Sequence, residues 1–383
     1  VKCWGRNEFA MNDGYGMLGQ GDESDRGDGP NEMGSNLPPV DFGVGRSAVA
    51  VSAAYQHTCA LLDDASVKCW GSNWNDELGQ GDTTDRGGAP NGECMGDSLP
   101  AVDLGADRTA VAISTGSAIS CALLDDATVK CWGGNWMGQL GRGDTSARGP
   151  GGEYLGDNCP VVDFGGNRTR TAVAISAGNS HTCALLDDAS VKCWGWNGDG
   201  RLGQGDTENR GDDPNEMGDN LHAVLLGAGR TAVAVSAGNS HTCALLDDAT
   251  VKCWGHNGQG QLGQGDTENR GDEPNAEMGD NLPVVLLGAG RTAVAVSAGS
   301  LHTCALLDDA TVKCWGGNWM GQLGQGDTTN RGDGPNEMAD TLPAVLLGAG
   351  RTAVAVNAGE GTTCALLVSR SPCGLMCRDP RGC

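Results

Sequence analysis

Cysteine is the residue whose spacing most plainly predicts a chemistry in this chain. Five pairs share a separation of ten residues: Cys59 with Cys69, Cys121 with Cys131, Cys183 with Cys193, Cys243 with Cys253, and Cys304 with Cys314. In the first pair, short apolar alternation on both sides of Asp63-Asp64-Ala65 predicts a β-hairpin with Asp64 at its tip. That register sets the cysteines opposite each other, with Cβ atoms roughly 4.5–5.5 Å apart, so we predict disulfides. The alternative is reduced cysteines packed as small apolar side chains.

The remaining cysteines predict further bridges. Cys3 lies in half a hairpin at one end of the chain and Cys364 in the other half near the opposite end, so we predict a bridge between Cys3 and Cys364; a local pair of Cys364 with Cys373 is the alternative. Cys94 and Cys159 occupy corresponding loops of consecutive repeats and are predicted to pair. Three cysteines are left in a dissimilar tail, residues 369–383: Cys373, Cys377 and Cys383. The 17 cysteines together indicate an oxidising compartment.

Tryptophan occurs at two kinds of position. One follows the second hairpin cysteine in every copy and is predicted to pack in the core: Trp4, Trp70, Trp132, Trp194, Trp254 and Trp315. The other lies in the turn after the hairpin: Trp74, Trp136 and Trp319 at one shared position, and Trp196 two residues earlier. Because other copies carry Glu8 or Gly258 at the shared position, we predict exposed tryptophans that contact sugars or protein partners. Packing over the rim is the alternative.

Carboxylates gather in a recurring loop, Asp206 to Asp219 in one copy. They could ligate Ca²⁺, but pairing with Arg210 and turn capping explain them more simply, so no cofactor is predicted and calcium is kept as an alternative. Arg-Gly-Asp occurs at four places because the repeat was duplicated, and we infer no cell-attachment role from it: Arg26, Arg210, Arg270 and Arg331.

Four histidines precede the first hairpin cysteine by two residues: His57, His181, His241 and His302. Ile119 and Thr362 replace them in two copies, and facing strands do not suit a tetrahedral zinc site, so a structural role is predicted. No nucleophile with its base, paired-carboxylate site or phosphate-binding loop is present, and the chain is predicted not to be an enzyme. Asn167-Arg168-Thr169 is an N-glycosylation sequon, with Asn167 as the acceptor in a secreted protein.

The elements that position these residues repeat about every 60 residues. Val-Lys-Cys-Trp-Gly begins at residues 1, 67, 129, 191, 251 and 312. Each period adds two apolar runs, such as 282–287 and 293–297, and no helical periodicity, which predicts four short strands. Four-stranded units repeated radially predict an all-β propeller with six blades over residues 1–368, closed by pairing of the first and last strands.

Composition restricts the function classes. The formal net charge of −24 excludes nucleic acid and anionic membrane surfaces as partners, since both need a basic footprint. No apolar run of about 18 residues is present, so no membrane insertion is predicted. The chain has 64 glycines but three Phe and three Tyr, so its core must be built from Val, Ala, Leu, Cys and Trp. The first residue is not Met, and we expect a mature product or a segment of a longer protein.

The repeat also resembles a known family. Gly-Gln-Leu-Gly-x-Gly-Asp, Val-Ala-Val-x-Ala-Gly-x-x-His-Thr-Cys-Ala-Leu and Val-Lys-Cys-Trp-Gly are similar to the regulator of chromosome condensation repeats and to the type II β-lactamase inhibitor protein propeller. The resemblance covers residues 1 to about 368 and implies a β-propeller, usually of seven blades, where this chain has six repeats. The nuclear, chromatin-binding role of the founding member fits neither the acidity nor the paired cysteines.

Together these features predict an extracellular or cell-surface structural or interaction module, part of a larger surface or matrix assembly. Its expected partners are proteins or further copies of itself. Two alternatives stay open. One is a carbohydrate-binding propeller that uses the exposed tryptophans, and the other, suggested by the resemblance, is an inhibitor or regulator of an enzyme.

Overall fold

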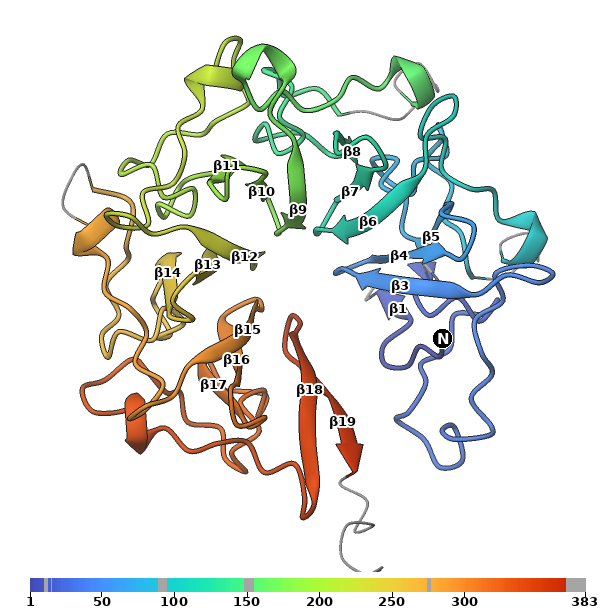
Figure 1. The fold of residues 1–383 in the computed structure, drawn as a ribbon. Coiled ribbons are helices and arrows are strands. Elements are labelled where there is room, and N and C mark those ends of the chain that lie inside the picture. The colour runs from blue at the N-terminus through green and yellow to red at the C-terminus, as the bar shows by residue number, and fades with distance from the viewer. Residues whose placement is uncertain (10–12, 15, 89–94, 148–154, 274–276, 370–383) are drawn as a thin grey trace, which may run out of the picture.

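The computed structural model describes residues 1–9, 13–14, 16–88, 95–147, 155–273 and 277–369. Its repeat units follow one another around a common centre, and in most of them the first strand points inward (Figure 1). The architecture is therefore the predicted all-β propeller, built from six repeats. The predicted tail lies outside the described residues except for Ser369, and so does Cys94, with the pairing to Cys159 that depends on it.

Five repeats form antiparallel sheets of three strands in the order first, second, third. These blades are β3 (Ala48–Ala53), β4 (His57–Leu62) and β5 (Val67–Gly71); β6 (Ala110–Thr115), β7 (Ile119–Leu124) and β8 (Val129–Gly133); β9 (Ala172–Ala177), β10 (His181–Leu186) and β11 (Val191–Gly195); β12 (Ala232–Ala237), β13 (His241–Leu246) and β14 (Val251–Gly255); and β15 (Ala293–Ala298), β16 (His302–Leu307) and β17 (Val312–Gly316). The sixth sheet pairs β18 (Arg351–Ala358) with β19 (Thr363–Ser369), and β1 (Glu8–Phe9) pairs with β2 (Asp13–Gly14). Short 3₁₀ turns occupy Gly96–Ser98, Gly156–Asn158, Gly166–Arg168, Gly218–Asn220, Gly279–Asn281 and Ala339–Thr341.

The hairpin register is the one predicted from the sequence. Leu61 pairs with Val67 and Cys59 with Cys69, and the same register recurs in the next four repeats. The facing cysteines are buried, and their Cα atoms lie 4.1 Å apart in every pair. A disulfide joins each of the five pairs: Cys59 to Cys69, Cys121 to Cys131, Cys183 to Cys193, Cys243 to Cys253, and Cys304 to Cys314. The predicted disulfides are therefore present and buried. The alternative, reduced cysteines packed as small apolar side chains, does not occur at these five pairs.

The fourth strand predicted for each blade, the apolar run before the inner strand, is not a strand in the structure. Beyond the three-stranded sheet, an isolated bridge joins Gly71 to Arg86 of the acidic loop, and equivalent bridges form at Gly5, Gly195, Gly255 and Gly316. The apolar run at 282–287 forms no ladder: Val285 N donates to Val251 O at 2.8 Å, but Pro283 lacks an N–H and the Leu287 carbonyl accepts from Lys313 Nζ instead. The outer run is therefore held by isolated hydrogen bonds rather than by strand pairing.

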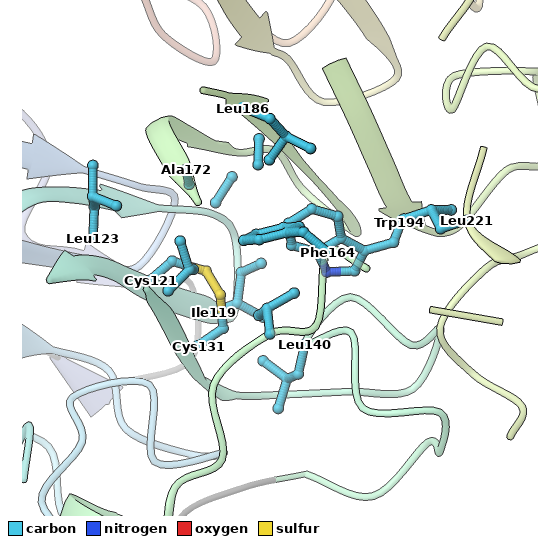
Figure 2. Packing of buried hydrophobic residues seen from close by; sticks show 14 residues of the cluster. Ile119, Cys121, Leu123, Cys131, Leu140, Phe164, Ala172, Leu186, Trp194 and Leu221 are labelled. Atoms are coloured by element: carbon cyan, nitrogen blue, oxygen red, sulfur yellow. A yellow bond between two sulfur atoms is a disulfide. The ribbon is translucent and has the colours of Figure 1, made fainter. Parts of the chain in front are cut away.

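The core lies between neighbouring blades. In Figure 2, Trp194 packs against Phe164, with ring centroids 5.8 Å apart, while the disulfide of Cys121 lies in the same cluster. Leu186 and Leu221 fill the space around the indole. Each further pair of neighbours repeats this arrangement around its own buried tryptophan, Trp70, Trp132, Trp254 or Trp315. A core of Trp, Leu, Val, Ala and sulfur is what the scarcity of Phe and Tyr predicted.

The described residues do not show the predicted pairing of the first and last strands, and the predicted bridge between Cys3 and Cys364 is wrong. Cys3 and Cys364 are both unbridged, and within the described residues β18 is the one strand with which β19 pairs. Residues 1–5 are held by their own repeat, since Gly5 pairs with Arg26 and Val40 N donates to Val1 O at 3.0 Å. Trp4 is consequently 56% exposed, whereas its five counterparts are buried, so the prediction that all six tryptophans belong to the core is wrong for Trp4.

The hairpin turns contain a strained backbone position in every complete repeat. The alanine after the two aspartates has a positive φ of 61–64°: Ala65, Ala127, Ala189, Ala249 and Ala310. A left-handed conformation costs an L-residue roughly 1–2 kcal/mol, but glycine adopts it freely and loses roughly 0.5–1 kcal/mol in chain entropy.

Replacing such an alanine should therefore stabilise the protein. We expect Ala249→Gly to raise the free energy of unfolding by roughly 0.5–1 kcal/mol, measured by urea denaturation. The matched control is Ala244→Gly, at a fully buried position inside β13, which should lower it. Equal destabilisation by both substitutions would contradict this assignment of strain.

Candidate functional site

The blades are joined through one backbone carbonyl in each repeat. Glu77 O accepts hydrogen bonds from two side chains of the next blade, Trp132 Nε1 at 3.1 Å and Ser120 Oγ at 2.8 Å. The same double acceptance occurs at four further carbonyls, those of Met17, Gln139, Arg201 and Gln261, with a threonine in place of the serine. Gln322 O accepts from Thr363 Oγ1 at 2.8 Å. These bonds fix each blade against its neighbour and hold the loop that follows the hairpin.

The histidines complete this junction. His241 Nε2 lies 2.8 Å from Thr303 Oγ1, and that hydroxyl already donates to Gln261 O, so the histidine must donate. His57, His181 and His302 make equivalent bonds to the next blade. Their Nδ1 atoms are buried and have no hydrogen-bond partner among the described residues. Burial lowers the pKa of His57 and His241 to about 3, that of His302 to about 4, and that of His181 well below its usual range. These residues are neutral structural groups.

The histidine junctions should make the protein sensitive to acid. Because the pKa is lowered in the folded state, the unfolded chain binds a proton at a pH where the folded chain does not. The stability present above the unfolded pKa of about 6.5 is therefore lost as the pH falls toward the folded pKa. We expect His241→Gln to make the free energy of unfolding less dependent on pH between 6 and 4, by about 1.4 kcal/mol per pH unit. The control is His222→Gln at an exposed position; an unchanged slope in His241→Gln would contradict this account.

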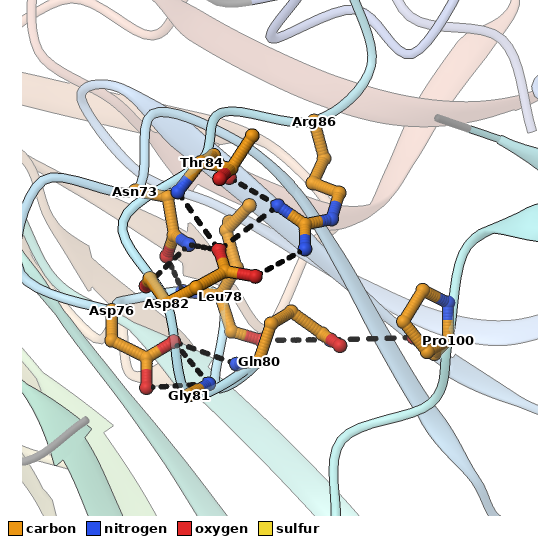
Figure 3. Close-up of polar contacts among 9 residues, drawn as sticks. All are labelled: Asn73, Asp76, Leu78, Gln80, Gly81, Asp82, Thr84, Arg86 and Pro100. Carbon is orange, nitrogen blue, oxygen red and sulfur yellow. Dashed lines mark hydrogen bonds and ion pairs between the residues drawn. The ribbon is translucent and has the colours of Figure 1, made fainter. Parts of the chain in front are cut away.

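The carboxylates of the recurring acidic loop form hydrogen bonds and ion pairs with nearby groups of the same repeat. In Figure 3, Asn73 Nδ2 donates to Asp82 O at 2.9 Å, and Arg86 Nη2 pairs with Asp82 Oδ2 at 2.7 Å. Asp76 accepts from the backbone N–H groups of Gln80 and Gly81. The arginines of the four Arg-Gly-Asp tripeptides form the same ion pair with the aspartate four residues earlier. Within the described residues no group of three or more His, Cys, Asp or Glu gathers as metal ligands would.

The candidate site is a groove between five loops. Three are the turns that join β3 to β4, β6 to β7 and β9 to β10, and the other two follow β5 and β8. We call it the aromatic groove. It encloses about 510 Å³. Trp74 and Trp136, from neighbouring repeats, line it together with Tyr55 and Met137. These four side chains are exposed, Trp74 by 64% and Trp136 by 52%. The groove therefore combines tryptophans that lie 62 residues apart in the sequence.

Polar groups without charge complete the lining. The side chains of Gln56, Asn75 and Asn179 form no hydrogen bond with any other described residue, although all three line the groove. Gln139 is only 2% exposed; its Oε1 accepts from Met137 N at 2.8 Å, while its Nε2 makes no hydrogen bond within the same part of the chain. Glu77 lies beneath Asn75, whose N–H it accepts at 2.6 Å, and burial raises the pKa of Glu77 to about 7.

The other predicted tryptophans lie apart from the groove. Trp319 is 47% exposed but is absent from the lining residues. Trp196 is half-buried and covers Arg201, whose guanidinium carbon lies 3.8 Å from the ring centroid. Arg201 is itself buried and forms an ion pair with Asp199. Of the four tryptophans singled out in the sequence, Trp74 and Trp136 are thus brought together, and Trp196 and Trp319 are not.

Among the lining residues sequence reasoning singled out Trp74 and Trp136 alone; those that it missed include Tyr55, Gln56 and Gln139. Tyr55 had a detectable signal, because the aligned position in the next two repeats holds the small residues Ser117 and Asn179. Gln139 had a weaker one: the same position is Glu77, Arg201 or Gln261 elsewhere, so the side chain varies while its carbonyl keeps the same junction role. Asn167, the predicted glycosylation acceptor, lies exposed in a 3₁₀ turn.

The fold is a propeller of repeated disulfide-bridged hairpins that carries an uncharged aromatic groove. The family model of the RCC1-like domain matches residues 1–371, and the chain belongs to this family. Over 287 residues it is 29% identical to the ultraviolet-B receptor UVR8 of Arabidopsis thaliana, covering 74% of this chain and 56% of that protein. It is also 28% identical over 282 residues to the human E3 ubiquitin-protein ligase HERC2, covering 73% of this chain and 5% of HERC2.

Two solved structures share the fold. Human WBSCR16 has a TM-score of 0.65 at 18% identity and covers 94% of this chain and 81% of that one. Prp20p of Saccharomyces cerevisiae, described with its binding to Gsp1p and histones, has a TM-score of 0.62 at 17% identity, covering 86% and 70%. The chain spans about half of UVR8 and a small part of HERC2. In the described part of this chain, no helix is long and apolar enough to cross a membrane.

Proposed function

We propose that this chain is an extracellular, non-enzymatic interaction module whose binding surface is the aromatic groove. The observation that carries the location is the set of five buried hairpin disulfides, since thiols in the cytosol are kept reduced. The charge of −24 suits a soluble surface or matrix protein and disfavours nucleic acid. Exposed Asn167 fits the same location as a glycosylation acceptor.

The interaction role rests on the groove and on the family. Half-exposed tryptophans beside a tyrosine are typical of binding surfaces, because they offer apolar area at little cost in conformational entropy. Prp20p, which shares the fold, is described with its binding to two kinds of protein, Gsp1p and histones. The described residues of the groove include no nucleophile paired with a base, and we propose binding rather than turnover as its chemistry. We place the module in a larger surface or matrix assembly.

The oxidised state is tested by peptide mapping under non-reducing conditions of the chain isolated from its native source. We expect five cystine-linked peptide pairs, each joining cysteines ten residues apart. Alkylation of Cys59 and Cys69 in that material would overturn the extracellular assignment.

The contribution of one disulfide to the free energy of unfolding can be measured separately. A double variant that combines Cys243→Ala with Cys253→Ala should lower the free energy of unfolding by about 3 kcal/mol, the loop-closure value for a ten-residue separation. Cys364→Ala is the matched control, because Cys364 is exposed and unbridged and should leave stability unchanged. A double variant as stable as the control would contradict a stabilising role for the bridges.

A further inference from the structure

We propose that the aromatic groove binds a neutral oligosaccharide. This inference rests on the proposed function, because it assumes that the groove is the binding surface, and it names the ligand class. Three features of the lining carry it: the aromatic faces, the unsatisfied amides and the lack of charge.

The aromatic faces suit a sugar ring. Trp74 and Trp136 come from successive repeats and are exposed over half of their surface, and Tyr55 is 44% exposed beside them. Sugar rings carry C–H groups on their faces and hydroxyls on their edges. Aromatic side chains bind such amphipathic groups well, since the ring covers the apolar face while polar neighbours stay within reach of the edge. The volume of about 510 Å³ lies in the range of small-molecule sites.

The buried amide of Gln139 supplies an independent indication of a ligand. Its Oε1 is fixed by Met137 N at 2.8 Å, which leaves Nε2 as a donor without a partner among the described residues, in a side chain that lines the groove and is only 2% exposed. In the repeat at Gln261 the same Nε2 is satisfied by His256 Nδ1 at 2.8 Å. Gln139 Nε2 is not one of the fully buried side-chain atoms without a partner, so it reaches the surface of the groove and is free to donate to an acceptor oxygen of a ligand.

The polar rim distinguishes a carbohydrate from a proline-rich peptide, which also packs on aromatic grooves. Gln56, Asn75 and Asn179 offer both amide donors and carbonyl acceptors, and Ser117 and Ser180 offer hydroxyls. A polyproline segment has carbonyl acceptors but no N–H groups, so it would leave the acceptors of the rim unpaired. A sugar hydroxyl donates and accepts in the same position and satisfies both kinds of group.

The lack of charge selects a neutral glycan. Among the described residues that line the groove there is no Asp, Glu, Lys, Arg or His, although the chain carries −24 overall. A sulfated or uronic-acid glycan would find no cation there and would be repelled by the surrounding acidic surface.

The test is binding of cellotriose, chitotriose, xylotriose and laminaritriose to the disulfide-bonded chain, measured by titration calorimetry after a glycan array has ranked neutral and acidic glycans. We expect at least one neutral trisaccharide to bind. Trp74→Ala and Trp136→Ala should each weaken that binding at least tenfold, whereas Trp319→Ala, a matched exposed tryptophan outside the groove, should leave it within twofold. Because all three side chains are about half exposed, thermal unfolding should confirm that each variant stays folded.

The outcomes separate this inference from the proposed function. Absence of binding to every neutral glycan, or binding that survives both groove substitutions, overturns the carbohydrate assignment. Binding of a proline decamer that Trp136→Ala abolishes, without glycan binding, also overturns it and leaves the interaction module standing. Free hairpin thiols in native material would instead overturn the extracellular role, whatever the groove binds.

Discussion

One shared backbone carbonyl per repeat holds this ring together. It accepts hydrogen bonds from the indole N–H of the next blade's core tryptophan and from a hydroxyl of that next blade. At three of the five such carbonyls a buried histidine in turn donates to the hydroxyl. Because these tryptophans are the largest fully buried side chains, their hydrogen bonds align the packing between blades as well as satisfying the indole N–H. The disulfide in each hairpin then keeps the two strands that carry these groups in register.

The repetition explains why the site is found where the repeats differ. In most repeats the histidine, hydroxyl, tryptophan and asparagine make the same internal hydrogen bonds, so these residues carry no information about a ligand. The positions free to vary are the inward turn and the loop after the hairpin. Trp74, Trp136 and Tyr55 occupy such positions in adjacent repeats, and the ring brings them to one groove.

The hairpins were almost completely predictable from the sequence. A ten-residue cysteine spacing with alternating apolar residues has one pairing register, and all five disulfides follow it. Ring closure was not predictable in the same way. It depends on the rotation from blade to blade, which a period of about 60 residues does not encode, and the predicted bridge between Cys3 and Cys364 does not form. The outer fourth strand was overestimated because an apolar run was taken as a ladder, whereas a proline and a lysine-bound carbonyl interrupt it at Pro283 and Leu287.

The same reasoning applies to the candidate site. Exposure of Trp74 and Trp136 was visible in the variation among copies, but their meeting in one groove depends on the order of the blades around the centre. Gln139 was hidden because its backbone role is common to all repeats and only its side chain is special.

The central claim is that a carbonyl of one blade accepts the core indole of the next, and exchange of the tryptophan indole protons tests it most directly. In nitrogen-15 spectra recorded after transfer to heavy water, we expect the indole N–H signals of Trp70, Trp132, Trp194, Trp254 and Trp315 to persist, and those of Trp4, Trp74, Trp136 and Trp319 to vanish at once. Loss of all the indole signals at one common rate would contradict the account.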